Sequence, residues 1–168
     1  MLFRSYLEAA ACGLRVIGGA GGGSGDAIPD RRVGDIVDPR DRDGLVEAVI
    51  RLVSDIKDRH QITRGNVVGH SDIAPARKRD PGELFPWGKL ARLRLALPRP
   101  SRNLMDPHWT EPGFLIALER FGYDVSDPMA AIMAFQRRFR PELIDGEIDA
   151  ECRMILLALL LPKPQGDE

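Results

Sequence analysis

The sequence has 168 residues, a mass of 18.6 kDa and a formal net charge of −1, from 24 Lys and Arg against 25 Asp and Glu. A chain of this length forms one domain or two small ones. Its near-neutral charge argues against general binding of nucleic acid or of an anionic membrane, which needs a surplus of Lys and Arg. Two cysteines make no disulfide framework, so a reducing compartment is expected. The longest apolar run, 154–161, is much shorter than the about 20 residues that span a membrane.

The first third of the chain alternates between helical and strand patterns. Helices are predicted over 2–12 and 43–60, and short strands over 15–18 and 33–37. The glycine-rich segment 18–25 lacks the spacing of a P-loop or of a dinucleotide-binding turn. We interpret it as a flexible turn rather than as a phosphate site. The alternation favours a small parallel sheet.

The remainder is predicted to be mainly helical. The residues predict a short buried strand at 66–70, an irregular loop at 71–86 and a helix at 87–97. A proline-containing linker follows at 98–102, and three more helices are predicted at 111–121, 127–139 and 149–160. Five apolar residues in the last helices have core spacing, namely Ile132, Phe135, Phe139, Ile155 and Leu159. The predicted fold class is therefore α/β: a small mixed or parallel sheet fragment with helices, followed by a three-helix C-terminal bundle.

One motif carries candidate metal chemistry. Residues 69–82 read Gly-His-Ser-Asp-Ile-Ala-Pro-Ala-Arg-Lys-Arg-Asp-Pro-Gly, and Leu-Phe-Pro-Trp follows at 84–87. This stretch resembles the type 2 N-acetylmuramoyl-L-alanine amidases, zinc enzymes that cut the bond between the sugar and the stem peptide of peptidoglycan. The resemblance implies that His70 and Asp80 are zinc ligands (Zn²⁺) and that Lys78 polarises the amide carbonyl. Taken alone, these residues are more typical of a surface histidine, a turn aspartate and a solvated lysine.

The neighbouring Ser71 and Asp72 are expected to hydrogen-bond the loop backbone rather than to take part in chemistry. The resemblance also implies a third zinc ligand and a catalytic glutamate from strands upstream of 43–60, where this sequence has no histidine. The other two histidines, His60 and His108, do not fall at ligand positions. Two ligands hold zinc weakly and no general base is identified, so catalysis by this chain is doubtful.

The C-terminal part resembles the three-helix peptidoglycan-binding module that often accompanies such amidases. The resemblance rests on Ala-Phe-Gln-Arg-Arg-Phe at 134–139, Asp-Gly at 145–146 and Ala-Leu at 158–159. Cys152 stands where that module has threonine. Peptidoglycan or a muropeptide is the partner that the resemblance implies. The polar residues 136–138 either contact glycan or peptide or form a solvated helix face.

The N-terminal part resembles family 4 glycosyltransferases, over the nucleotide-sugar half of their fold. The similarity lies in residues 7–19, Gly-Gly at 22–23, Asp-Ala-Ile at 26–28 and Asp-Pro-Arg-Asp at 38–41. It implies that Glu8 matches the second glutamate of a pair that grips the donor ribose, but the first glutamate is missing. Without that partner, we expect Glu8 to be a helix-surface residue. Cys12 is expected to pack as a small apolar side chain.

These resemblances predict four segments: glycosyltransferase-like at 1–54, the C-terminal part of an amidase domain at 55–97, a linker at 98–110 and a peptidoglycan-binding-like module at 111–168. Three functions remain open: a zinc-dependent amidase relative with an incomplete site, a non-catalytic peptidoglycan-binding protein, or a nucleotide-sugar transferase fragment. The first residues lack the apolar core of a signal peptide, so a cytoplasmic location is expected, although the family also acts in the cell envelope. Exposed strand edges predict self-association.

Overall fold

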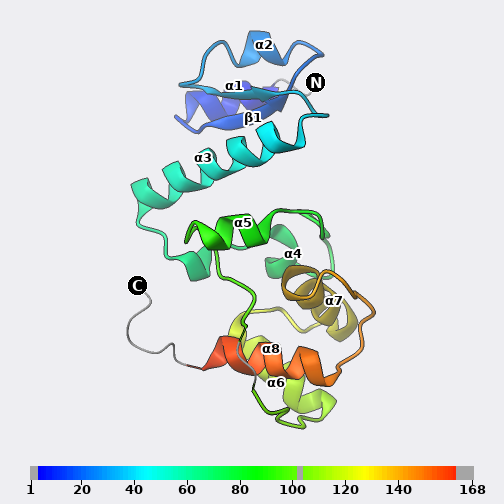
Figure 1. Ribbon diagram of the computed structural model, residues 1–168. Coiled ribbons are helices and arrows are strands. Elements are labelled where there is room, and N and C mark those ends of the chain that lie inside the picture. Colours follow the sequence, from blue (N-terminus) through cyan, green and yellow to red (C-terminus); the bar gives the residue numbers. More distant parts are fainter. Residues whose placement is uncertain (1–3, 102–103, 162–168) are drawn as a thin grey trace. The chain divides into compact units, whose positions relative to one another are not determined.

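The structure is a computed structural model that describes residues 4–101 and 104–161 (Figure 1). Its helices and strands are α1 (Arg4–Ala11), β1 (Val16–Gly19), α2 (Ser24–Ala27), β2 (Gly34–Val37), α3 (Arg42–His60), the 3-10 helix η1 (Arg64–Asn66), α4 (His70–Ile73), α5 (Trp87–Arg92), α6 (Glu111–Phe121), α7 (Pro128–Phe139) and α8 (Ala150–Leu160). The predicted mixed α/β class is confirmed. The chain divides into two compact units, one ending at Thr63 and the other beginning at Arg64.

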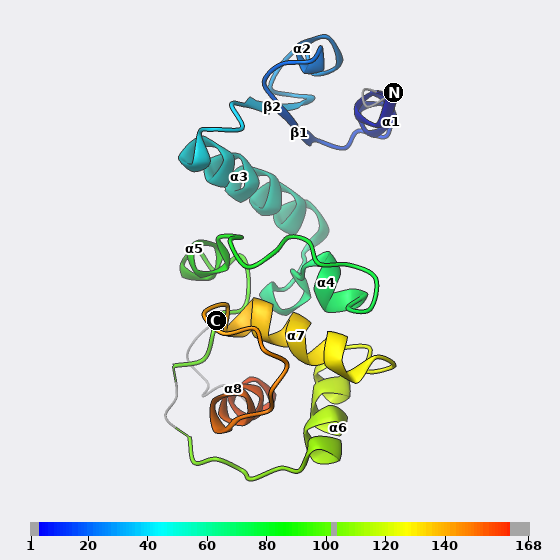
Figure 2. The same cartoon turned by 90° about the vertical axis from the view of Figure 1, so that its right-hand side faces the viewer.

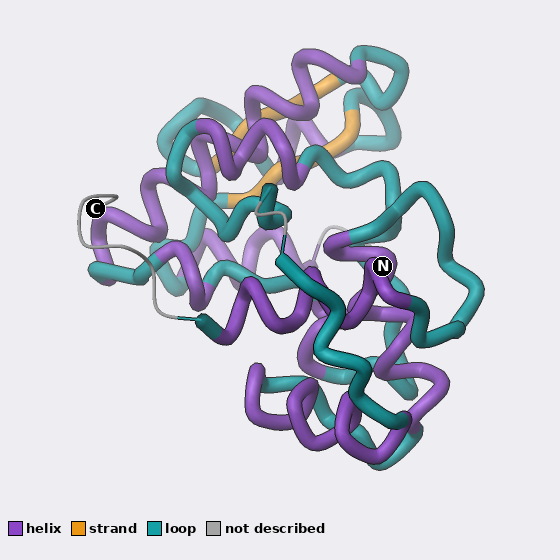
Figure 3. The backbone as a smooth tube through the Cα atoms, turned by 60° about the horizontal axis from the view of Figure 1, so that its bottom comes forward, coloured by secondary structure: helices purple, strands orange, loops and turns teal. Residues whose placement is uncertain are grey.

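The first unit is built on a parallel pair of short strands. β1 pairs with β2 from Val16 opposite Gly34 to Gly19 opposite Val37, and the two strands run side by side in Figure 3. Both α1 and α3 contact this sheet. The strands form because the predicted pattern of two apolar segments connected by a helical crossover favours parallel pairing. The predicted parallel sheet fragment is therefore present.

Two side chains of the first unit test the sequence interpretation. Glu8 is exposed and its carboxylate accepts a hydrogen bond from Arg4 at 2.9 Å, as expected of a helix-surface residue. The prediction that Cys12 packs as an apolar side chain is wrong, because Cys12 is exposed at the end of a helix that buries none of its residues. The glycine-rich segment forms a turn, with positive φ at Gly21, Gly22 and Gly23, before the four-residue helix α2.

The second unit contains one apolar core shared by α6, α7 and α8, which lie together in Figure 2. The core includes Phe114, Leu118, Ile132, Phe135, Phe139, Ile155 and Leu156, each at most 6% exposed. Four of the five residues predicted for the core are buried there, and Leu159 is partly buried against it. None of the helices in the described ranges is both long and apolar enough to cross a membrane.

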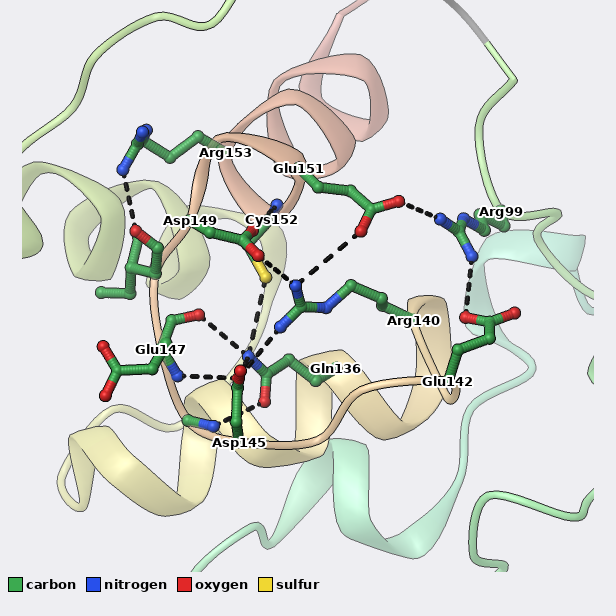
Figure 4. A network of polar contacts seen from close by, with 12 residues as sticks. Arg99, Gln136, Arg140, Glu142, Asp145, Glu147, Asp149, Glu151, Cys152 and Arg153 are labelled. Carbon is green, nitrogen blue, oxygen red and sulfur yellow. Dashed lines mark hydrogen bonds and ion pairs between the residues drawn. The ribbon is translucent and has the colours of Figure 1, made fainter.

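A buried arginine closes the loop between α7 and α8 (Figure 4). Arg140, only 2% exposed, pairs with Asp145 at 3.0 Å and with Asp149. Gln136 donates to the carboxylate of Asp145 at 2.9 Å, and its own carbonyl oxygen accepts from the backbone N–H of Gly146 at 2.8 Å. Charged groups remain in this interior because each is paired or hydrogen-bonded.

The polar residues at 136–138 do not behave as predicted. Gln136, Arg137 and Arg138 are 0%, 9% and 7% exposed, so they do not form the solvated helix face. Each is held by partners that the local sequence does not show. Arg137, for example, pairs with Glu83 at 3.9 Å.

The two cysteines differ in environment, and this predicts a difference in reactivity. Cys152 is fully buried near the start of α8, and burial raises the pKa of its thiol to about 11. At about pH 8, close to the ordinary thiol pKa of about 8.5, we expect a thiol reagent to modify Cys12 rapidly and Cys152 slowly. Both should react in denaturant, and Cys12→Ser should abolish the rapid phase. Rapid labelling of two thiols in the native chain would contradict this prediction.

The raised thiol pKa also has a defined effect on stability. An unfolded chain ionises this thiol near its ordinary pKa, whereas the folded chain keeps it neutral to about pH 11. The contribution of the neutral Cys152 is therefore present below about pH 8.5 and is lost as the pH rises toward the folded value.

Candidate metal-binding site

The loop that carries the motif begins differently from its prediction. The strand predicted over 66–70 is wrong: η1 ends at Asn66, and α4 begins at His70. A strand needs a neighbour for its backbone hydrogen bonds, and β1 and β2 form the whole sheet in the described residues. The carbonyl of Val67 accepts instead from the Arg138 guanidinium at 3.3 Å.

The loop brings His70 and Asp80 together. His70 Nδ1 lies 3.2 Å from Asp80 Oδ2, and the side chains are 50% and 64% exposed. The backbone supports the contact, because the N–H of Ser71 donates to the carbonyl of Asp80 at 2.9 Å. An imidazole nitrogen and a carboxylate oxygen therefore meet at a solvent-accessible point.

The separation of this pair can be compared with zinc geometry. Nitrogen and oxygen ligands about 2.0–2.2 Å from a tetrahedral zinc lie about 3.3–3.6 Å from each other. The observed 3.2 Å between His70 Nδ1 and Asp80 Oδ2 is slightly shorter than this distance between two zinc ligands. The two residues fit two corners of a zinc site, but the described ranges contain no group of three His, Cys, Asp or Glu that could hold a metal. His108 lies beside Asp106 at 3.4 Å instead.

Lys78 lies in the same loop and is half-buried. Its backbone N–H donates to the carbonyl of Ala74 at 3.0 Å, which fixes the turn before Asp80. Among the described residues its ammonium makes no ion pair with Asp80. Its role toward a substrate carbonyl stays a prediction.

Asp72 is a buried polar residue of α4, within the motif. One carboxylate oxygen accepts from the N–H of Gly69 at 2.7 Å, as the sequence predicts for this residue. The other accepts from the hydroxyl of Tyr123 at 2.7 Å, and Arg138 Nε lies 3.8 Å from Asp72. Burial and the nearby carboxylate raise the pKa of Tyr123 well above its ordinary value. Sequence reasoning missed this contact with Tyr123, because no local pattern connects the two segments.

A pocket of 400 Å³ lies beside this network. It is lined by Gly65, Asn66, Val68, Asp72, Ile73, Leu97, Phe121, Gly122, Tyr123, Arg138 and Phe139. His70, Lys78 and Asp80 are not among its lining residues. The pocket is therefore not lined by the candidate ligands His70 and Asp80.

Comparisons with known proteins place this loop in context. No sequence model of a protein family matches the chain. The N-acetylmuramoyl-L-alanine amidase AmiD of Escherichia coli K12 is 45% identical over 129 residues, which cover 68% of this chain and 47% of AmiD. The structure of E. coli AmiD with the substrate anhydro-N-acetylmuramic acid-L-Ala-D-gamma-Glu-L-Lys matches with a TM-score of 0.64 and 35% identity, over 76% of this chain and 60% of that chain.

Two further similarities are shorter or weaker. AmpDH3 from Pseudomonas aeruginosa matches with a TM-score of 0.51 and 29% identity, over 75% of this chain and 59% of that chain. A GDP-mannose-dependent mannosyltransferase of Mycolicibacterium smegmatis is 42% identical over 50 residues, 30% of this chain and 13% of that protein, which supports the glycosyltransferase-like segment only weakly. The chain spans about half the length of AmiD. Over the 129 matched residues, the chain is a homologue of the N-acetylmuramoyl-L-alanine amidase AmiD.

Proposed function

We propose that this chain acts on peptidoglycan as a zinc-dependent amidase relative, with His70 and Asp80 as zinc ligands and Lys78 as the donor that polarises the N-acetylmuramoyl–L-alanine amide. The observation that carries the proposal is the 3.2 Å contact between His70 and Asp80 on an exposed loop. The similarity to AmiD, whose solved complex contains a muropeptide substrate, supports peptidoglycan as the proposed substrate.

The contribution of each residue follows from its chemistry. A zinc ion that is held by three protein ligands would acidify a bound water and act as a Lewis acid. The described residues supply two, so we assign no hydrolytic step to the metal. A well-placed cationic donor such as Lys78 stabilises a developing oxyanion by up to about 3–4 kcal/mol.

A non-catalytic peptidoglycan-binding protein is the second candidate. The number of candidate zinc ligands favours it. A hydrolytic zinc site takes three protein ligands, whereas this loop brings two together. We propose that binding would then use α6, α7 and α8 as a peptidoglycan-binding-like bundle. A nucleotide-sugar transferase is not proposed, because the similarity to the mannosyltransferase covers only 13% of that protein.

Zinc binding tests the proposed ligands directly. We expect the purified chain to bind zinc, and His70→Ala and Asp80→Ala each to weaken binding at least about 10-fold, because each removes one ligand. Competition with a chromophoric chelator measures the affinity. His108→Ala is the matched control, since that exposed histidine contacts Asp106 and not the pair. Equal zinc affinity in His70→Ala and the unmodified chain would refute the site.

Incubation with muropeptides separates the two candidates. Release of stem peptide that is lost in Lys78→Ala, but kept in the control Lys89→Ala on the exposed face of α5, would establish the amidase. Sedimentation with intact peptidoglycan without release would establish the binding protein instead.

A further inference from the structure

We infer that Tyr123 and Arg138, from the C-terminal helical region, are positioning residues that hold the loop carrying His70 and Asp80 in its metal-binding geometry. The metal-binding part of this inference rests on the proposed function. The positioning part rests on contacts within the second unit, which reach the loop on both sides of the pair.

The first contact acts through Asp72, which lies two residues after His70 in α4 and is 7% exposed. Its two carboxylate oxygens accept from the Gly69 N–H and from the Tyr123 hydroxyl, each at 2.7 Å. Since His70 lies between Gly69 and Asp72 in the chain, fixing this carboxylate fixes the backbone from which the imidazole projects. Tyr123 is therefore the outer support of that short turn.

The second contact acts through Arg138, whose side chain is 4% exposed. Its guanidinium carbon lies 3.1 Å from the centre of the Trp87 ring, and one nitrogen donates to the carbonyl of Val67 at 3.3 Å. Val67 precedes His70 and Trp87 follows Asp80. One buried cation thus contacts both arms of the loop, and stacking on Trp87 adds an attraction specific to a cation over an aromatic ring.

Trp87 packs close to the chain neighbours of the two candidate ligands. A Cβ built on Gly69 would lie 2.7 Å from Pro81 Cδ and 3.4 Å from Trp87 Cζ2, so only glycine fits at this close approach. Pro81 is the neighbour of Asp80, and Gly69 is the neighbour of His70. The spacing of the pair is therefore set by a packed group whose outer supports are Arg138 and Tyr123.

The test measures zinc affinity in Tyr123→Phe and Arg138→Lys. Each is expected to bind zinc about 10-fold more weakly than the unmodified chain, which is the usual loss when a residue that orients a ligand is changed. Arg140→Lys is the matched control, because Arg140 is a buried arginine next to α7 whose ion pairs are with Asp145, Asp149 and Glu151. It should lower the unfolding midpoint without changing zinc affinity. Equal weakening in Arg140→Lys, or unchanged affinity in both test variants, would overturn the inference.

Amide hydrogen exchange separates this inference from the proposed function. The N–H of Ser71, bonded to the Asp80 carbonyl, reports the loop in metal-free protein. We expect its exchange to accelerate in Tyr123→Phe and Arg138→Lys and to stay unchanged in Arg140→Lys. If this result occurs and the unmodified chain binds no zinc, the positioning role stands and the proposed metal site fails. If zinc binds normally in every variant and Ser71 exchange is unchanged, the positioning role fails and the metal site stands.

Discussion

Phe135→Ala is expected to lower the free energy of unfolding of the second unit by about 3–5 kcal/mol, the range for removing a buried phenylalanine ring. Phe135 is fully buried in α7. Its ring centre lies 5.3 Å from that of Phe139, 5.9 Å from that of Phe114 and 6.1 Å from that of Tyr123. The alanine variant loses these contacts and leaves a cavity at the centre of the shared core.

Urea unfolding followed by tryptophan fluorescence measures this loss. Trp87 and Trp109 are the two tryptophans of the sequence, and both lie in the second unit, so the signal reports that unit alone. Ile116→Ala is the matched control on α6, because Ile116 is 60% exposed, and it should change stability by less than about 0.5 kcal/mol. Similar losses in the two variants would show that Phe135 does not have this central place.

Arg140→Met is expected to cost about 3 kcal/mol, at the lower end of the range for removing one partner of a buried ion pair. The arginine is 2% exposed, whereas Asp145 and Asp149 are 32% and 42% exposed and can recover part of their hydration. The loss arises because the loop between α7 and α8 is closed by this cation. The same urea titration measures it.

The control for Arg140→Met is Arg99→Met. Arg99 pairs with Glu142 at 2.9 Å and with Glu151 at 2.5 Å, but the three side chains are 39%, 69% and 47% exposed. Ion pairs with this degree of exposure contribute about 0–1 kcal/mol, so this variant should be nearly as stable as the unmodified chain. A larger loss for Arg99→Met than for Arg140→Met would contradict the assignment of the buried cation.

Local sequence patterns were sufficient to predict two of the C-terminal helices. The helices predicted at 127–139 and 149–160 begin one residue later in the structure, and Asp127 and Asp149 cap them by accepting from Ala130 and Cys152 backbone N–H groups. Periodicity and an N-terminal aspartate are sufficient for such helices. The strand at 66–70 failed, because its formation depends on a neighbouring strand and not on its own apolar residues.

The candidate site was predictable to a similar extent. The motif containing His70 and Asp80 identified the pair, through a resemblance that covers the whole loop. Tyr123 and Arg138 were not found, because their partners Asp72 and Val67 lie far away in the sequence. The sequence of α7, with three consecutive polar residues at 136–138, does not show whether the Arg138 side chain is buried or solvated.

The stacking of Arg138 on Trp87 has a consequence for how such a protein can be divided. A gene fragment that stops anywhere in 98–110 would encode the amidase-like loop without the two side chains that brace it. We expect the motif and the helices after it to be inherited together, since recombination within 98–110 would separate His70 and Asp80 from Tyr123 and Arg138.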